Sequence, residues 1–257
     1  MEPTSIPIRV LATCALAAIP SLAAAQDAGP PDHDARLIVT GSAGVVSDYR
    51  YRGLSRSDGD AAVHGQAFVE LGGGVYAGVW GSSLGGDDQG AGDAEIDLIA
   101  GIDRDIASGL SLDIGATYFM FAGNGGPRLA QGLGDLGSYG EGNASLSYTL
   151  GPVQAKLGAS YAPDQASIGG DNLYLYGQAS AGIPATPLTL TAKWGRSKGS
   201  LAPGGDAYWD WSLGGDYVVG PVTLGAKYVD TDLPETGIKA IDRLGDASVV
   251  VSATIGF

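Results

Sequence analysis

The sequence contains almost no cysteine and few charged residues. Its single cysteine, Cys14, lies within the first 25 residues, and charged side chains make up only 16% of the 257 residues. Beyond that first segment, no run approaches the roughly 20 apolar residues that a membrane-spanning helix needs, and strong helical periodicity is missing. These absences exclude a disulfide scaffold, thiol chemistry and a bundle of membrane helices for the rest of the chain.

Basic residues are also scarce. Lysine and arginine number 14 against 28 aspartates and glutamates, so the formal net charge is −14. A surface that binds nucleic acid must neutralise phosphates and is therefore basic, which excludes nucleic acid as a partner. The chain is rich in glycine instead, with 43 residues, and glycine and proline recur at the regular intervals that are typical of an all-β fold.

The N-terminal segment has the layout of a targeting signal. An apolar, alanine-rich stretch follows Arg9, contains Pro20 and ends in the small residues Ala23, Ala24 and Ala25. This arrangement predicts a cleaved signal peptide over residues 1–25. A flexible N-terminal tail is then expected over 26–35, and a single domain over 36–257.

The end of the chain alternates strictly between two kinds of residue. From Ala247 to Phe257, every second residue is apolar and the residues between them are mostly polar or small. A period of two is typical of a β-strand with two different faces. Similar alternation recurs upstream, with charged side chains on the polar face. Because Lys or Arg on a lipid-facing surface costs about 2–4 kcal/mol at the membrane midplane, the pattern favours strands with lipid outside and water inside.

Twelve segments fit this pattern. They run over residues 36–52, 61–71, 75–84, 93–104, 109–121, 139–150, 152–162, 173–183, 187–198, 207–219, 221–230 and 247–257. Short and long connections alternate between them, as in outer-membrane barrels with short periplasmic turns and long outer loops. In lipid every backbone group must be paired, so the strands must close into a ring. The predicted fold class is an all-β, transmembrane, antiparallel up-and-down β-barrel of 12 strands, located in a bacterial outer membrane.

Three motifs in the first strands are similar to those of a known family. Residues 47–57 read SDYRYRGLSRS, residues 74–82 read GVYAGVWGS, and residues 95–98 read EIDL. With these motifs the chain resembles the TorF family of outer-membrane porins of proteobacteria. The resemblance implies a barrel in the outer membrane and a role in solute passage. It implies no catalytic residue.

Charged side chains that point inward by parity are the candidate functional residues. The pore-lining candidates are Lys156, Lys193, Lys227, Asp48, Arg50, Arg52, Glu95, Asp97, Asp113, Glu141 and Asp210. The three lysines occur on alternate strands at similar height. Asp48, Arg50 and Arg52 share the inner face near the outer end of the first strand. Rings of charge set the selectivity of pores. The set predicts a channel for passive diffusion of small hydrophilic solutes or ions, with a preference for cations because acids are in excess.

Two other functions remain open on the sequence. The inward charges could fill the lumen with salt bridges, as in small barrels, which would make the protein a closed structural or surface-interaction barrel. A lipid-modifying barrel enzyme would need a histidine with a nucleophile and an orienting group. His64 points inward by parity and has no evident serine partner, so we expect no enzyme. We also expect no metal and no cofactor.

The remaining expectations concern the membrane and its components. Aromatic residues near strand ends predict girdles at both membrane interfaces. They are Tyr49, Tyr51, Tyr118, Tyr148, Tyr161, Trp194, Trp209, Trp211, Tyr217, Tyr228 and Phe257. The expected partners are outer-membrane lipid and lipopolysaccharide, small solutes or ions, and the barrel assembly machinery, which would engage the C-terminal strand ending in Phe257.

Overall fold

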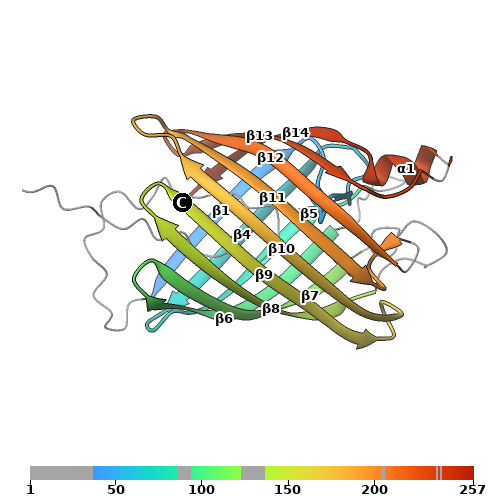
Figure 1. The fold of residues 1–257 in the computed structure, drawn as a ribbon, viewed down its shortest axis with the longest axis horizontal. Coiled ribbons are helices and arrows are strands. Elements are labelled where there is room, and N and C mark those ends of the chain that lie inside the picture. Colours follow the sequence, from blue (N-terminus) through green and yellow to red (C-terminus); the bar gives the residue numbers. More distant parts are fainter. Residues whose placement is uncertain (1–36, 86–93, 123–136, 204–205, 236, 238) are drawn as a thin grey trace, which may run out of the picture.

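The computed structural model describes residues 37–85, 94–122, 137–203, 206–235, 237 and 239–257. The predicted signal peptide (1–25) and N-terminal tail (26–35) lie outside these residues. The described chain forms a closed barrel whose strands tilt strongly across it (Figure 1).

The barrel consists of 12 long antiparallel strands. They are β1 Ile38–Val46, β4 Ala62–Leu71, β5 Val75–Ser83, β6 Ala94–Ala107, β7 Leu110–Ala122, β8 Tyr139–Leu150, β9 Val153–Gln165, β10 Gly170–Gly182, β11 Leu188–Gly199, β12 Ala207–Val219, β13 Val222–Thr231 and β14 Ser248–Gly256. Each strand pairs with its sequence neighbours, and β1 closes the ring by pairing with both β14 and β4. The predicted 12-stranded antiparallel barrel is confirmed.

Three shorter elements complete the described chain. Strands β2 (Arg50–Tyr51) and β3 (Leu54–Ser55) pair with each other in a separate small hairpin, and helix α1 (Lys239–Gly245) precedes β14. None of the helices in the described residues is both long and apolar enough to cross a membrane.

The two faces of each strand follow the period of two in the sequence. In β6, Glu95 and Asp97 point inward and are fully buried, whereas Ile96 and Leu98 are 39% and 49% exposed on the outside. The same arrangement in the other strands leaves a broad apolar exterior, with Leu157, Leu213 and Val249 all more than 60% exposed. Because a contiguous apolar surface of this extent is unfavourable in water, the exterior is that of a barrel that spans a membrane.

Tight turns join the strands at one end of the barrel, and longer connections join them at the other. We call these the tight-turn end and the long-loop end. At the tight-turn end, Gly109, Gly151 and Gly220 adopt φ values of 71°, 57° and 57°, which glycine reaches without a steric penalty. Strand β1 starts and β14 ends at this same end, so both ends of the barrel chain lie there (Figure 1).

One predicted long connection, over residues 163–172, is wrong. Strand β9 continues to Gln165 and β10 starts at Gly170, so that only residues 166–169 form the turn. The side chain of Gln165 supports this extension because it accepts a hydrogen bond from Gly140 N at 2.8 Å and donates one to Gly140 O at 2.9 Å. The side-chain amide thus continues the pairing of β9 with β8 beyond the backbone ladder.

Candidate functional site

The connection between β1 and β4, residues 47–61, folds into the barrel. We call it the inner loop. Its Arg56 forms an ion pair with Glu95 on β6, while the carbonyl of Arg52 accepts a hydrogen bond from the Tyr208 hydroxyl on β12 at 2.9 Å. Strands β6 and β12 lie on opposite sides of the ring. The inner loop therefore crosses the lumen from wall to wall.

A two-residue turn gives the inner loop its tip. Tyr51 pairs with Leu54, and between them Arg52 and Gly53 have φ values of 52° and 83°. Positive φ at both central residues is the geometry of a type I′ hairpin turn, which glycine favours at the second position. An arginine in the left-handed region is unfavourable on its own, so the contacts of its side chain must hold it there.

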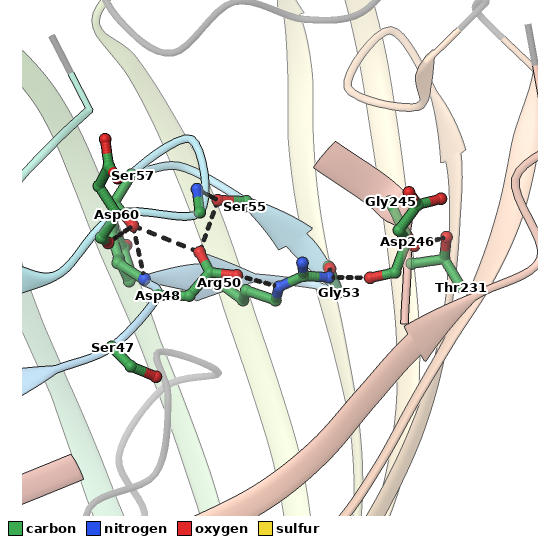
Figure 2. A network of polar contacts seen from close by, with 12 residues as sticks. Ser47, Asp48, Arg50, Gly53, Ser55, Ser57, Asp60, Thr231, Gly245 and Asp246 are labelled. Atoms are coloured by element: carbon green, nitrogen blue, oxygen red, sulfur yellow. Dashed lines mark hydrogen bonds and ion pairs between the residues drawn. The ribbon is translucent and has the colours of Figure 1, made fainter. Parts of the chain in front are cut away.

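Asp48 folds the base of the inner loop onto itself, as Figure 2 shows. Its Oδ2 accepts a hydrogen bond from Arg50 Nε at 2.6 Å, and its Oδ1 accepts one from Ser55 Oγ at 2.6 Å. The hydroxyl of Ser57 accepts a bond from Tyr49 N at 2.8 Å and donates to Asp60 O at 2.6 Å. These short polar side chains close the segment locally, which replaces the strand pairing that β1 loses after Val46.

Arg50 ties the inner loop to the last part of the chain. Its Nη1 donates to Gly53 O at 3.1 Å and to Asp246 O at 2.6 Å (Figure 2). A second tie lies at the exposed rim, where Arg243 of α1 forms an ion pair with Asp58. The segment around α1 thus buttresses the inner loop from the long-loop end.

Arg52 is the most enclosed charge of the inner loop. Its Nη2 donates to both carboxylate oxygens of Glu141 on β8, at 2.7 and 2.6 Å. The guanidinium also lies 4.7 Å from the ring centre of Tyr51 and 4.3 Å from that of Tyr174. Burial alone would lower the pKa of Arg52, but the Glu141 carboxylate and the neighbouring tyrosines raise it above its ordinary value. Arg52 therefore stays charged inside the barrel.

Arg56 makes a similar arrangement on β6, two strands away from the β8 wall that Arg52 contacts. It pairs with Glu95, and its guanidinium lies 3.8 Å from the ring centre of Tyr51. The rings of Tyr51 and Phe119 meet edge to face at 5.7 Å, and Phe119 stacks on Tyr139 at 4.6 Å. Aromatic and cationic faces attract each other most strongly where water is excluded. The inner loop is therefore anchored by packing as well as by ion pairs.

Gly53 offers a direct test of this packing. A Cβ at Gly53 would lie 2.5 Å from Thr231 Cγ2 and 2.8 Å from Asp210 Cβ, whereas a Cβ at Gly59, which has the same φ of 83°, would meet nothing within 4 Å. We expect Gly59→Ala to cost about 1 kcal/mol from backbone strain alone, and Gly53→Ala to cost clearly more. The measurement is urea unfolding of the two variants in detergent micelles. Equal losses would show that the tip is not packed against β12 and β13.

The predicted positions of Asp48, Arg50 and Arg52 on the inner face of a strand over 36–52 are wrong. Strand β1 ends at Val46, and the three residues belong to the inner loop, where they lie within the lumen by a different route. The assignment of Tyr49 and Tyr51 to an outer girdle is wrong for the same reason, since both are buried inside. The other predicted girdle residues, from Tyr118 to Phe257, are exposed on the barrel surface as expected.

The remaining predicted carboxylates are divided between two levels of the lumen. Glu95, Asp97, Glu141 and Asp210 lie towards the long-loop end and surround the inner loop. Among the described residues, no hydrogen-bond partner meets either oxygen of Asp97 or the Oε2 of Glu95. With Asp48, the level of the inner loop holds five carboxylates beside its three arginines. Asp113 lies nearer the tight-turn end and accepts a hydrogen bond from Tyr76 at 2.8 Å.

The three predicted lysines line the wall below the inner loop, towards the tight-turn end. Lys156 and Lys193 are both cross-strand partners of Gln178, which places them in one row over β9, β10 and β11. Lys227 lies on β13, opposite Gly214 of β12. The ammonium of Lys193 is 5.4 and 5.3 Å from the ring centres of Tyr174 and Tyr176.

Sequence reasoning missed the partners that make this site. Arg56, Tyr174 and Tyr208 were not among the candidates, yet they hold the inner loop. The available signal was the end of apolar alternation at Val46, followed by a serine-rich segment with an Arg-Gly turn. Among the described residues, no group of three or more His, Cys, Asp or Glu side chains could hold a metal ion. His64 has one described hydrogen-bond partner, Thr254 Oγ1 at 3.4 Å.

The barrel is similar to solved porins. A KdgM porin in complex with disordered oligogalacturonate matches with a TM-score of 0.56 at 7% identity, covering 86% of this chain and 99% of that one. A NanC porin matches with a TM-score of 0.53 at 10% identity, also covering 86% and 99%. At such low identity these matches show a shared fold and nothing further.

The sequence was also compared with curated proteins and with models of protein families. None of the curated proteins compared matches the chain. A family model does match, over residues 31–257, and so includes every strand of the barrel. The chain belongs to the family described as "Bacterial protein of unknown function (Gcw_chp)".

Proposed function

We propose that the protein is a porin-like channel that lets small hydrophilic solutes or ions diffuse passively across a bacterial outer membrane. The observation that carries the proposal is a closed 12-stranded barrel with an apolar exterior and a charged lumen. Porins of similar fold support it. The resemblance to the TorF family also supports a channel. The matching family is described without a function, so membership of the TorF family stays a prediction.

The inner loop is the constriction of this channel. It reaches from β6 to β8 and β12, and its three arginines are held by Glu95, Glu141, Asp48 and the Asp246 carbonyl. Solutes would pass between this loop and the parts of the wall that it does not touch. The pore-lining candidates then fall into two levels. The gate level lies around the inner loop and consists of Asp48, Arg50, Arg52, Glu95, Asp97, Glu141 and Asp210. The lower level consists of Lys156, Lys193, Lys227 and Asp113.

We further propose a preference for cations. Counting Asp103 and Asp216 at inward-facing positions of β6 and β12, lumen carboxylates outnumber the six lumen bases, and at the gate level the arginine charges are offset by their acidic partners, which leaves Asp210 as an additional acid. Fixed charge at a narrow level of a pore attracts the oppositely charged ion. Lys193 and Lys227 oppose this effect from the lower level.

A closed barrel is the second candidate, and one observation favours it. The inner loop is enclosed so completely that Arg50, Arg52 and Arg56 are all at most 7% exposed. A lumen filled in this way could serve as a rigid support for outer loops, without transport. The distinction rests on whether water-filled space continues past the loop, which conductance measures directly.

The test is single-channel recording of the purified protein in a planar bilayer with a salt gradient across it. We expect discrete conductance steps and a reversal potential that favours the cation. The double variant Lys193→Gln/Lys227→Gln should increase that preference, because it removes two basic groups from the lumen. Silent protein that is shown to be folded would support the closed barrel, and a reversal potential favouring chloride would contradict the cation preference.

The proposed location brings several partners with it. Cleavage of residues 1–25 would release the mature chain into the periplasm, and the barrel assembly machinery would recognise the strand that ends in Phe257. In support, Phe257 is 75% exposed, and its backbone exchanges hydrogen bonds of 2.9 Å with Gly41 at the seam of the barrel. Outer-membrane lipid and lipopolysaccharide would surround the exterior.

A further inference from the structure

Two basic side chains stand out on an exterior that is otherwise nearly uncharged. Arg196 and Lys198 both point outward from β11, close to its long-loop end, and both are exposed. We call this pair the basic patch. Among the described strands, the other outward charges are single residues: Arg104 at the tight-turn end of β6, Asp171 at the start of β10 and Asp230 near the end of β13.

Tryptophans gather beside the basic patch. Three of the four tryptophans in the chain face outward here: Trp194 on β11, and Trp209 and Trp211 on β12. Trp209 is the cross-strand partner of Arg196, whose guanidinium lies 5.6 Å from the indole ring centre. Tryptophan concentrates where a membrane's hydrocarbon meets its head groups. The basic patch therefore lies at head-group level, where a charged side chain costs about 0–1 kcal/mol instead of the larger penalty at the midplane.

The charge of this patch has no ion-pair partner in the part of the chain that the structure describes. Arg196 and Lys198 form no ion pair with any described residue. Acids close by make other hydrogen bonds: Asp232 accepts one from Trp209 N at 2.6 Å, Asp171 accepts one from Tyr161 at 3.1 Å, and Asp230 accepts one from Tyr228 at 2.8 Å. The strand partners of Lys198 are Leu173 and Ala207, which offer only apolar surface.

We propose that the basic patch binds the phosphorylated head group of an outer-leaflet glycolipid. Arg196 and Lys198 would contact its phosphate groups, while the tryptophans and Leu173 pack against sugar and acyl chain. Guanidinium and ammonium donors suit phosphate oxygens, and a lipid brings both the anion and the apolar portion to one surface. The inference rests on the proposed outer-membrane location, and it is independent of whether the lumen conducts.

The test is native mass spectrometry of the detergent-purified protein titrated with diphosphorylated lipid A. The wild type should retain the lipid, and Arg196→Gln/Lys198→Gln should bind it about thirtyfold more weakly, because each of the two basic groups near a membrane surface contributes about a fivefold factor. Arg196→Lys/Lys198→Arg should bind like the wild type. Arg104→Gln is the matched control, since it removes an outward base at the opposite end of the barrel.

Two results would overturn the proposal. Equal binding by the glutamine double variant would show that lipid A does not use the basic patch. Equal retention of phosphatidylglycerol and lipid A by the wild type would show that the patch is a general anionic surface and not a glycolipid site. Conductance of the double variant, recorded in parallel, separates this outcome from a failure of the channel proposal, because the substituted side chains do not face the lumen.

Discussion

Replacing residues 48–57 with a glycine–serine linker of equal length is expected to increase single-channel conductance several-fold. The replaced segment carries Arg50, Arg52 and Arg56, which hold the inner loop against the wall. Without these side chains the linker has no ion pairs or aromatic packing to keep it in the lumen. Conduction through a barrel of this size is limited by its narrowest level, so removing the constriction should dominate every other effect.

Arg243→Gln is the control for this experiment. It breaks the exposed ion pair with Asp58 at the rim and leaves the buried anchors in place. Exposed pairs contribute about 0–1 kcal/mol, so its conductance should match the wild type. An unchanged conductance in the linker variant, with its barrel shown to be folded by resistance to SDS at room temperature, would show that the inner loop does not limit the pore.

The largest expected loss of stability follows from Glu141→Gln. The carboxylate of Glu141 is the partner of Arg52, and both side chains are only 2% exposed. Removing one member of a buried pair leaves an uncompensated charge, which typically costs about 3–5 kcal/mol. We expect that loss in the free energy of unfolding, measured with urea in detergent micelles. The control is Glu235→Gln, which should be unaffected because Glu235 is an exposed acid in the connection after β13.

A double variant shows whether the loss comes from the unpaired charge. Arg52→Met/Glu141→Leu removes both charges together and fills their space with apolar side chains. Replacing a buried pair in this way is often neutral, so the double variant should be more stable than Glu141→Gln. If the double variant is instead the less stable of the two, the arginine must contribute mainly through its stacking on Tyr51 and Tyr174.

The strands could be predicted from the sequence because lipid imposes a strict rule on their faces. Successive residues of β6 and β14 must alternate between the lipid-facing and the lumen-facing side of the barrel. A shift of one residue in β6 would move Glu95 or Asp97 into lipid. The predicted strand count and the inward orientation of the lysines follow from that constraint. It acts on every strand separately and needs no knowledge of contacts between distant residues.

The inner loop escaped prediction because it lies in the lumen, where that rule does not apply. Residues 47–52 continue an apparent alternation of tyrosine with charge, so parity alone extends β1 through them. Their true partners, Glu141 and Tyr208, are distant in the sequence, and their pairing depends on the closed ring. The hairpin signal was weak as well, because arginine is an unusual residue for the first position of a type I′ turn.

The anchoring of Arg50 to Asp246 has a consequence for folding. This hydrogen bond joins residues that are 196 positions apart, and the ring itself closes only when β14 pairs with β1. Contacts between such distant segments form late, since the loop-closure entropy must be overcome first. The first connection of the barrel to be synthesised is therefore among the last to reach its final place, and the lumen must stay wide enough to admit it until the ring is complete.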